Sequence, residues 1–279
     1  MDATAGLRPS PIAGVWYSSN PAALRDQLSR LMDAAQTPAL PAPLGLIAPH
    51  AGYRYSGRTA AHAFRCVRGL TFDVVAVLSP LHHYLPHPVI TSAHSAYQTP
   101  LGAVEIDQPA LQRFTASLAQ KDLEVAAVSQ DGEHSLEIEL PFLQTALAAP
   151  FTLLPVMLRT LAGGTLQAVA SALVRALAGR RALLVASSDL SHFHPQTRAE
   201  QLDAVILGQI EQFSPEGVLH AERSRTGFAC GAPAVAAVLW AARALGANKA
   251  AILHYSTSAQ ETGDLSSVVG YGAAALYRE

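Results

Sequence analysis

The chain has 279 residues, of which half are hydrophobic and 14% are charged, and its formal net charge is −2. This composition can bury a large core and excludes a disordered chain, which would carry more charge and fewer apolar residues. Lys and Arg are scattered, so we expect no nucleic-acid partner. The sequence has no apolar run of the roughly 20 residues that cross a membrane and no basic, then hydrophobic N-terminal stretch. We therefore expect a cytoplasmic protein without a membrane partner.

The first part of the chain predicts alternating helices and strands. Asn20 and Pro21 are typical of a helix start, because Asn caps helices and Pro suits their first turn. The apolar run 44–48 predicts a buried strand, and a second helix is predicted at 56–67. The run 74–78 repeats the pattern of the first strand.

The rest of the chain continues this alternation. Further strands are predicted at 89–91, 104–106, 125–128, 151–157, 182–187, 251–255 and 268–273. Further helices are predicted from Asp107, over 134–147, 166–177 and 198–213, and from Cys230. The pattern predicts an α/β fold with a mainly parallel or mixed sheet flanked by helices. No repeat or charged linker divides the chain, so we expect a single domain over residues 1–279, with its functional site at the strand ends.

Histidines follow two of the predicted strands. His50 comes after the strand at 44–48, and His82 and His83 come after the strand at 74–78. Neighbouring strand ends would bring one member of this pair close to His50. Adjacent side chains usually point apart, so one of the pair would be a ligand or base and the other structural. Ordinary loop histidines are the alternative.

A carboxylate and an imidazole follow the strand predicted at 182–187. Asp189 can orient His192, or one of the two can act as a general base, because imidazole titrates near neutral pH and a carboxylate fixes its tautomer. Alternatively, Asp189 and Ser191 cap the next helix. A hydrolase with Ser187 or Ser188 as nucleophile is disfavoured, because no Gly-x-Ser-x-Gly turn frames either serine.

Three further positions are candidates for the same pocket. Cys230 lies at a predicted helix start, where the helix dipole stabilises the thiolate that binds metals, although an inert thiol is the alternative. His134 and Glu137 are three residues apart on one face of the predicted helix, where they can share a metal ion or a proton, or form a solvated first turn. Tyr53 is a weaker candidate for the pocket rim.

Several short motifs occur in order along nearly the whole chain. They are Ala13-Gly14-Val15-Trp16-Tyr17, Ala48-Pro49-His50-Ala51-Gly52-Tyr53, Pro80-Leu81-His82-His83, Glu133-His134-Ser135-Leu136-Glu137, Ser187-Ser188-Asp189 with His192, and Cys230-Gly231. Together they resemble the MEMO family. That family is related to the catalytic subunits of class III extradiol dioxygenases, which are non-haem iron enzymes that open catechol rings.

The resemblance implies a class III extradiol dioxygenase-like α/β domain. It also implies that His50, His82 and Cys230 are metal ligands and that Asp189 and His192 lie beside them as catalytic residues. Iron or copper is the implied metal. In bacteria, the AmmeMemoRadiSam system implies an AMMECR-type protein and a radical-SAM protein as partners.

Ring cleavage does not follow from the resemblance. Cysteine stands where the dioxygenases use a carboxylate, and a thiolate is softer and more readily oxidised. Three functions therefore stay open. The first is a metal-binding protein with redox or oxygen-related chemistry, the second an active dioxygenase, and the third a module that binds a peptide or small ligand in the same pocket.

Overall fold

Short runs of valine, leucine and alanine form the centre of the protein. In the computed structural model, which describes residues 6–129 and 131–279, β2 (Gly45–Ala48), β9 (Ala182–Ser187) and β3 (Val74–Pro80) are parallel neighbours. Every residue of β2 and β3 is buried, as expected of strands covered on both faces. Each buried Val or Leu side chain contributes about 1.5–3 kcal/mol, so these strands anchor the fold.

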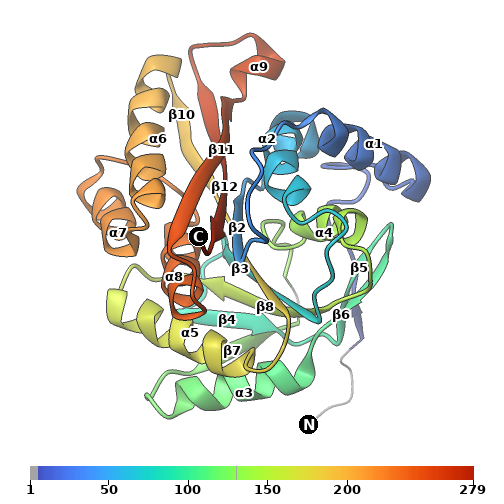
Figure 1. Cartoon of the computed structure of the whole chain (residues 1–279), viewed down its shortest axis with the longest axis vertical. Coiled ribbons are helices and arrows are strands. Elements are labelled where there is room, and N and C mark those ends of the chain that lie inside the picture. Colours follow the sequence, from blue (N-terminus) through green and yellow to red (C-terminus); the bar gives the residue numbers. More distant parts are fainter. Residues whose placement is uncertain (1–5, 130) are drawn as a thin grey trace.

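Among the described residues, nine strands form one mixed sheet (Figure 1). Its parallel centre extends from β3 to β8 (Thr152–Leu158). Beyond β8, β4 (Val89–Ser92) is antiparallel to β8, and β7 (Val125–Val128) is parallel to β4.

On the other side of the centre, antiparallel strands complete the sheet. β12 (Val268–Tyr277) pairs with β2, and also with β10 (Asp189–His194) and β11 (Lys249–Thr257). A separate small sheet contains β1 (Leu7–Arg8), β5 (Ala96–Thr99) and β6 (Gly102–Glu105). The single α/β domain with a mixed sheet that the sequence predicts is confirmed.

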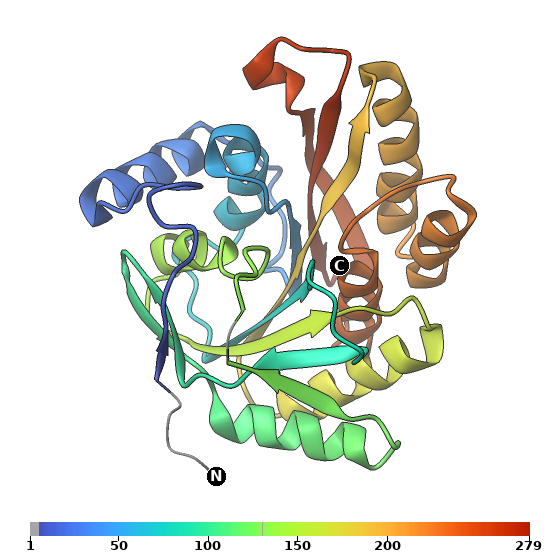
Figure 2. The ribbon, with the colours of Figure 1, turned by 180° about the vertical axis from the view of Figure 1, so that it is seen from behind.

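Helices cover both faces of the large sheet (Figures 1 and 2). On one face, α2 (Tyr53–Arg65) packs against β2, β11 and β12, and α1 (Pro21–Ala34) and α4 (Glu139–Ala146) pack beside it. The start of α1 is the predicted one, because the Asn20 side chain accepts hydrogen bonds from Ala22 N and Ala23 N, both at 3.0 Å.

The opposite face is covered by α8 (Ala232–Ala244), which packs on β2, β3 and β9. Next to it lie α5 (Gly163–Ala176) and α3 (Gln108–Ala119), and α3 begins at the predicted cap Asp107. Ten of the 13 residues of α8 are buried, which explains its nearly uninterrupted apolar sequence. The remaining helices are α6 (Gln196–Glu211), α7 (Pro215–Ser224) and α9 (Ala259–Thr262).

One local prediction near the site is wrong, and so is the helix-cap alternative for Asp189 and Ser191. The helix predicted from His134 begins only at Glu139, because residues 135–138 form turns. Asp189 and Ser191 cap no helix, since both belong to β10, whose Asp189 is paired with Tyr271 of β12. Within the described part of the chain, none of the helices combines the length and apolar character needed to cross a membrane.

Candidate metal centre

The carboxyl ends of three parallel strands meet at one edge of the sheet. Because β9 lies between β2 and β3, the loops that follow these strands are brought together. His50 comes two residues after β2, His82 comes two residues after β3, and Ser187 is the last residue of β9. This edge is where ligands collect in open α/β sheets.

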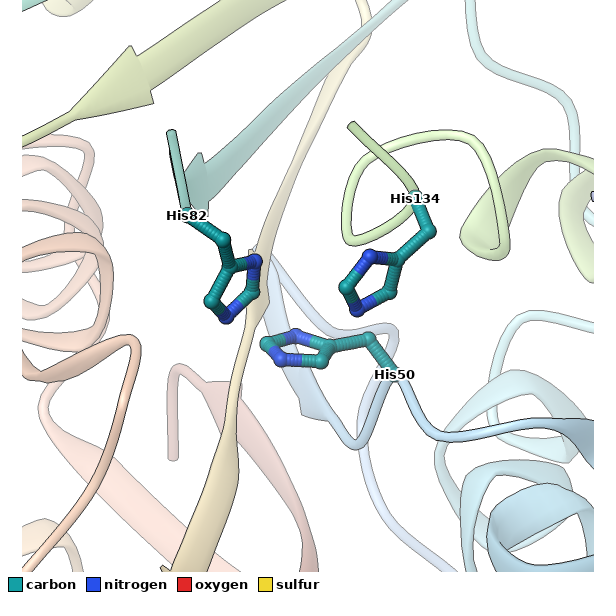
Figure 3. A group of neighbouring side chains, drawn as sticks. All are labelled: His50, His82 and His134. Carbon is teal, nitrogen blue, oxygen red and sulfur yellow. The ribbon is translucent and has the colours of Figure 1, made fainter. Parts of the chain in front are cut away.

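Three histidine rings converge at this edge (Figure 3). His50, His82 and His134 each offer one ring nitrogen, and these three nitrogens lie within 4.8 Å of one another. The ring centroids of His82 and His134 are 4.8 Å apart and nearly parallel, and His50 stands edge-on to both at 5.4 and 5.5 Å. The fold therefore brings together His50 and His82, as expected, and adds His134.

One buried carboxylate orients two of these histidines. Glu133 Oε1 lies 2.9 Å from His82 Nδ1 and 3.3 Å from His134 Nδ1. Glu133 also accepts hydrogen bonds from the backbone N–H groups of His82, His134 and Ser135. Burial acts to raise the pKa of Glu133, but these hydrogen bonds hold that pKa well below its ordinary value. An ionised Glu133 therefore fixes the His82 ring by its Nδ1 and leaves its Nε2 to face the centre, and it holds the backbone of His134 beside it.

The third ring, His50, is held by the neighbouring strand β9. Its Nδ1 lies 3.0 Å from Ser187 Oγ, and its backbone N–H donates to Asp189 Oδ1 at 2.7 Å. On the opposite side of the ring, Nε2 lies 3.1 Å from Cys230 Sγ. The thiol therefore points at the nitrogen that hydrogen bonding leaves free.

Burial keeps two of these imidazoles neutral. It lowers the pKa of His50 well below its ordinary value and that of His134 to about 4, and the neighbouring histidines lower the pKa of His50 further. For His82, the hydrogen bond to Glu133 raises the pKa. Because neutral imidazole is the form that binds metals, His50 and His134 are prepared for coordination at neutral pH.

Asp189 and His192 lie beside this cluster, on β10. Burial raises the pKa of Asp189 to about 7, although its Oδ1 accepts the backbone bond from His50. Its Oδ2 lies 4.0 Å from His50 Nε2. Burial lowers the pKa of His192 to about 4, and its ring packs against the rings of Phe193 and Phe228. His192 is therefore neutral at neutral pH.

Cys230 directly precedes Gly231, the cap residue of α8, as the sequence predicts. This position at the helix start does not by itself lower the pKa of the thiol. Burial and the nearby Asp189 raise the pKa of Cys230 well above its ordinary value, which overrides the expected stabilisation by the helix start. The thiol of Cys230 is therefore protonated at neutral pH in the metal-free protein.

The other candidate residues have different surroundings. The side chain of His83 is exposed, and its carbonyl accepts a hydrogen bond from Arg159. Tyr53 is buried in the core, where its hydroxyl donates to Ile138 O at 2.5 Å. Glu137 does not share a helix face with His134, because this segment is a turn.

The carboxylate of Glu137 is bound on the far side of this turn. It accepts hydrogen bonds from Arg8 at 2.5 Å and from Tyr17 at 2.6 Å, and it also binds Ser10. Arg8 is itself buried, and it donates to Asp131 Oδ1 and to the Glu133 carbonyl, both at 2.6 Å. These contacts attach the N-terminal strand to the loop that carries Glu133 and His134.

A groove of about 490 Å³ opens beside His82 and Cys230. Its apolar wall includes Leu81, Leu161 and Phe228, and Arg159 and Glu222 are polar parts of its lining. This volume lies in the range of small-molecule sites, which are typically apolar with a few polar groups.

The donor set fits a first-row transition metal. Imidazole and thiolate ligands suit iron, copper and zinc, and carboxylate oxygens, which magnesium and calcium prefer, do not dominate the cluster. Two ligands bound tetrahedrally at about 2.0–2.3 Å from a metal lie roughly 3.3–3.7 Å from each other. The Cys230–His50 separation of 3.1 Å is close to this value. The group of ligand atoms that lie within 4.8 Å of one another contains His134 and does not contain Cys230.

Sequence reasoning missed two residues that organise the cluster. Glu133 stands inside a quoted motif, but nothing in the sequence shows that its carboxylate is buried. The sequence indicates Ser187 only as a candidate nucleophile, whereas its hydroxyl contacts His50. The position of Glu133 immediately before His134 was the available signal, because carboxylates commonly orient metal-binding histidines.

The fold and the site define an α/β protein whose central strand ends carry a cluster of three histidines able to hold a metal ion, with the Cys230 thiol 3.1 Å from His50 Nε2. Within that class, the chain belongs to the family of Memo-like proteins, whose family model matches residues 8–275. The resemblance seen in the sequence motifs is thereby confirmed.

Relatives from archaea support this assignment. The chain is 34% identical over 229 residues to a MEMO1 family protein of Nitrosopumilus maritimus, with 82% of each chain covered. It is 35% identical over 275 residues to one of Methanothermobacter thermautotrophicus, covering 95% of this chain and 98% of the relative. A third, from Methanosarcina barkeri, is 31% identical over 269 residues, covering 96% and 98%.

Proposed function

We propose that this protein binds a redox-active transition metal, iron or copper, through His50, His82 and Cys230, and carries out redox or oxygen-related chemistry on a small ligand. The observation that carries the proposal is the convergence of a thiol and hydrogen-bonded imidazoles at the ends of β2 and β3. When bound, the metal would supply one-electron or oxygen chemistry. His134 is adjacent to this ligand set.

The surrounding residues support a prepared site. Glu133 holds His82 by its Nδ1 and Ser187 holds His50 by its Nδ1, so neither ring has to be reoriented for binding. The raised pKa of Cys230 means that binding releases the thiol proton.

We assign proton transfer to His192 and the positioning of His50 to Asp189. His192 is neutral because burial lowers its pKa to about 4, so its ring can accept a proton from a bound ligand. Asp189 accepts a hydrogen bond from the His50 backbone, which places that ring beside Cys230. The groove lined by His82, Cys230 and Phe228 is the route by which a ligand would reach these groups.

Metal affinity of variants tests the ligand set. Protein purified anaerobically is loaded with Fe(II) or Cu(I), and the dissociation constant is measured by competition with a chelator. His82→Gln and His83→Gln form a matched pair of adjacent residues, of which only His82 lies in the cluster. We expect at least about a tenfold loss for His82→Gln, His50→Gln and Cys230→Ser, and a change within about threefold for His83→Gln.

Two outcomes would contradict this assignment. Equal metal affinity of the wild type and His50→Gln would contradict a metal centre at this site. A large loss of metal affinity in His134→Gln, with no loss in Cys230→Ser, would mean that His134 and not Cys230 is the third ligand. Oxygen consumption with a panel of catechols tests the dioxygenase alternative, and partner binding by metal-free protein with unchanged affinity would favour a binding module.

A further inference from the structure

A second glutamate, Glu139, is buried behind His50. It is the first residue of α4, and only 1% of its surface is exposed. Its Oε1 lies 2.6 Å from Ser187 Oγ, which in turn lies 3.0 Å from His50 Nδ1. A continuous line of polar atoms therefore connects Glu139 through Ser187 to the histidine, and none of the functions assigned above uses Glu139.

The hydrogen bonds around Ser187 determine where the protons lie. Ser187 Oγ is 2.5 Å from the carbonyl oxygen of Ser135, and a carbonyl oxygen can only accept a hydrogen bond. A hydroxyl has a single proton, so that proton is committed to Ser135. Glu139 Oε1 and His50 Nδ1 then face the lone pairs of the same oxygen, and both must donate to it.

An ionised Glu139 does not satisfy this count. Its carboxylate would need the hydroxyl proton, and two oxygen acceptors, Ser187 Oγ and Ser135 O, would then face each other at 2.5 Å without a proton between them. A carboxylic acid resolves the conflict, because it donates through Oε1.

We infer that Glu139 is a neutral carboxylic acid that, through Ser187, fixes His50 as the Nδ1–H tautomer and so presents Nε2 to Cys230 and the metal. Glu139 is thus a positioning residue that acts through Ser187. The metal-facing part of this inference rests on the proposed function, whereas the protonation of Glu139 and the tautomer of His50 are properties of the metal-free protein.

The surroundings of Glu139 agree with this assignment. Burial raises the pKa of Glu139 well above its ordinary value, and the nearby Asp189 adds to that effect. Among the ion pairs of the described residues, none involves Glu139. Glu133 has the opposite environment, with a ring and three backbone N–H groups donating to it. One short segment therefore holds an anionic and a neutral glutamate, each orienting a different part of the cluster.

Infrared difference spectra of metal-free protein at neutral pH test the protonation state. A protonated carboxyl group has a C=O stretching band that a carboxylate lacks. We expect this band to decrease in Glu139→Gln relative to wild type and to be unchanged in Glu133→Gln, which is the matched control. Identical spectra of wild type and Glu139→Gln in the region of the protonated carboxyl band would overturn the inference.

The tautomer of His50 tests the positioning role. Selective ¹⁵N labelling of histidine distinguishes Nδ1–H from Nε2–H in the metal-free protein. Glu139→Gln keeps an N–H donor toward Ser187, so we expect the wild-type tautomer and a metal affinity within about threefold. Glu139→Leu removes the donor, and we expect a mixture of tautomers and roughly a tenfold weaker affinity.

A wild-type tautomer in Glu139→Leu would refute the positioning role. If that variant does not fold, the infrared result and the tautomer in Glu139→Gln still decide the matter, because a changed tautomer in Glu139→Gln contradicts a neutral acid. If neither the wild type nor any variant binds metal, the proposed function fails. The spectra of the metal-free protein still test the protonation of Glu139 and the tautomer of His50, because they need no metal.

Discussion

Replacing Glu133 with Gln removes the carboxylate that orients both His82 and His134. Glu133 accepts from His82 N at 2.5 Å, His82 Nδ1 at 2.9 Å, His134 N at 2.9 Å and Ser135 N at 3.0 Å. Gln offers one accepting oxygen, and its amino group opposes at least one of these N–H groups. Hydrogen bonds to a charged group contribute about 1.5–3 kcal/mol each. With 38% of the His82 side chain exposed, solvent replaces part of the loss, and we expect about 2–4 kcal/mol less stability.

The same substitution should weaken metal binding by roughly 10–100-fold, the usual effect of removing a carboxylate that orients a histidine ligand. Urea unfolding measures the stability and chelator competition measures the affinity. Glu137→Gln is the control, because Glu137 is buried in the same segment but is bound by Arg8 and Tyr17. We expect that control to lose stability and to keep its affinity within about threefold. Equal losses of affinity in both variants would refute the orienting role and indicate general damage to the loop.

Two further predictions concern electrostatics and packing. Burial raises the pKa of Asp189 in the folded protein to about 7, so its favourable contribution is fully present at acid pH and is lost as the pH rises through about 7. Metal-free Asp189→Asn should therefore gain stability relative to wild type, by on the order of 1–3 kcal/mol between roughly pH 5 and pH 8, and parallel pH profiles in urea unfolding would contradict this. A Cβ atom at Gly231 would lie 2.3 Å from Ser187 O and 2.7 Å from Ser188 Cβ, so Gly231→Ala should cost about 1–3 kcal/mol and displace Cys230. Thermal unfolding measures this loss of stability, with Gly164→Ala as the control, because a Cβ at Gly164 meets no atom within 4 Å. Equal stability of the two variants would show that the loop at Gly231 adapts.

The central strands could be predicted from the sequence because their apolar runs are short and clearly bounded. The predicted strands at 44–48, 74–78 and 182–187 correspond to β2, β3 and β9, and these positions place His50 and His82 at strand ends. The insertion of β9 between β2 and β3 could not be read from local pattern, because strand order depends on how distant segments pack.

The errors near the site have local causes. Leu136 has helical spacing with Leu140, Leu143 and Leu147, but the chain makes turns over 135–138, where Arg8 and Tyr17 bind the Glu137 side chain. Asp189 has the composition of a helix cap, yet pairing with β12 makes it part of a strand.

The protonation states of the site residues could not be predicted from the sequence either. The helix start at Cys230 was visible in the sequence, but its pKa depends on burial and on Asp189, which only the folded chain brings near. The same holds for Glu133 and Glu139, which have identical side chains and opposite surroundings.

The position of β12 constrains how the chain reaches its folded state. Residues 268–277 pair with β2 on one side and with β11 on the other, although β2 is formed by residues 45–48. During synthesis, β2 therefore keeps an unpaired edge until residues 268–277 have left the ribosome, and such edges favour association with other chains. An affinity tag placed after residue 279 consequently needs a flexible linker, so that β12 remains free to complete the sheet.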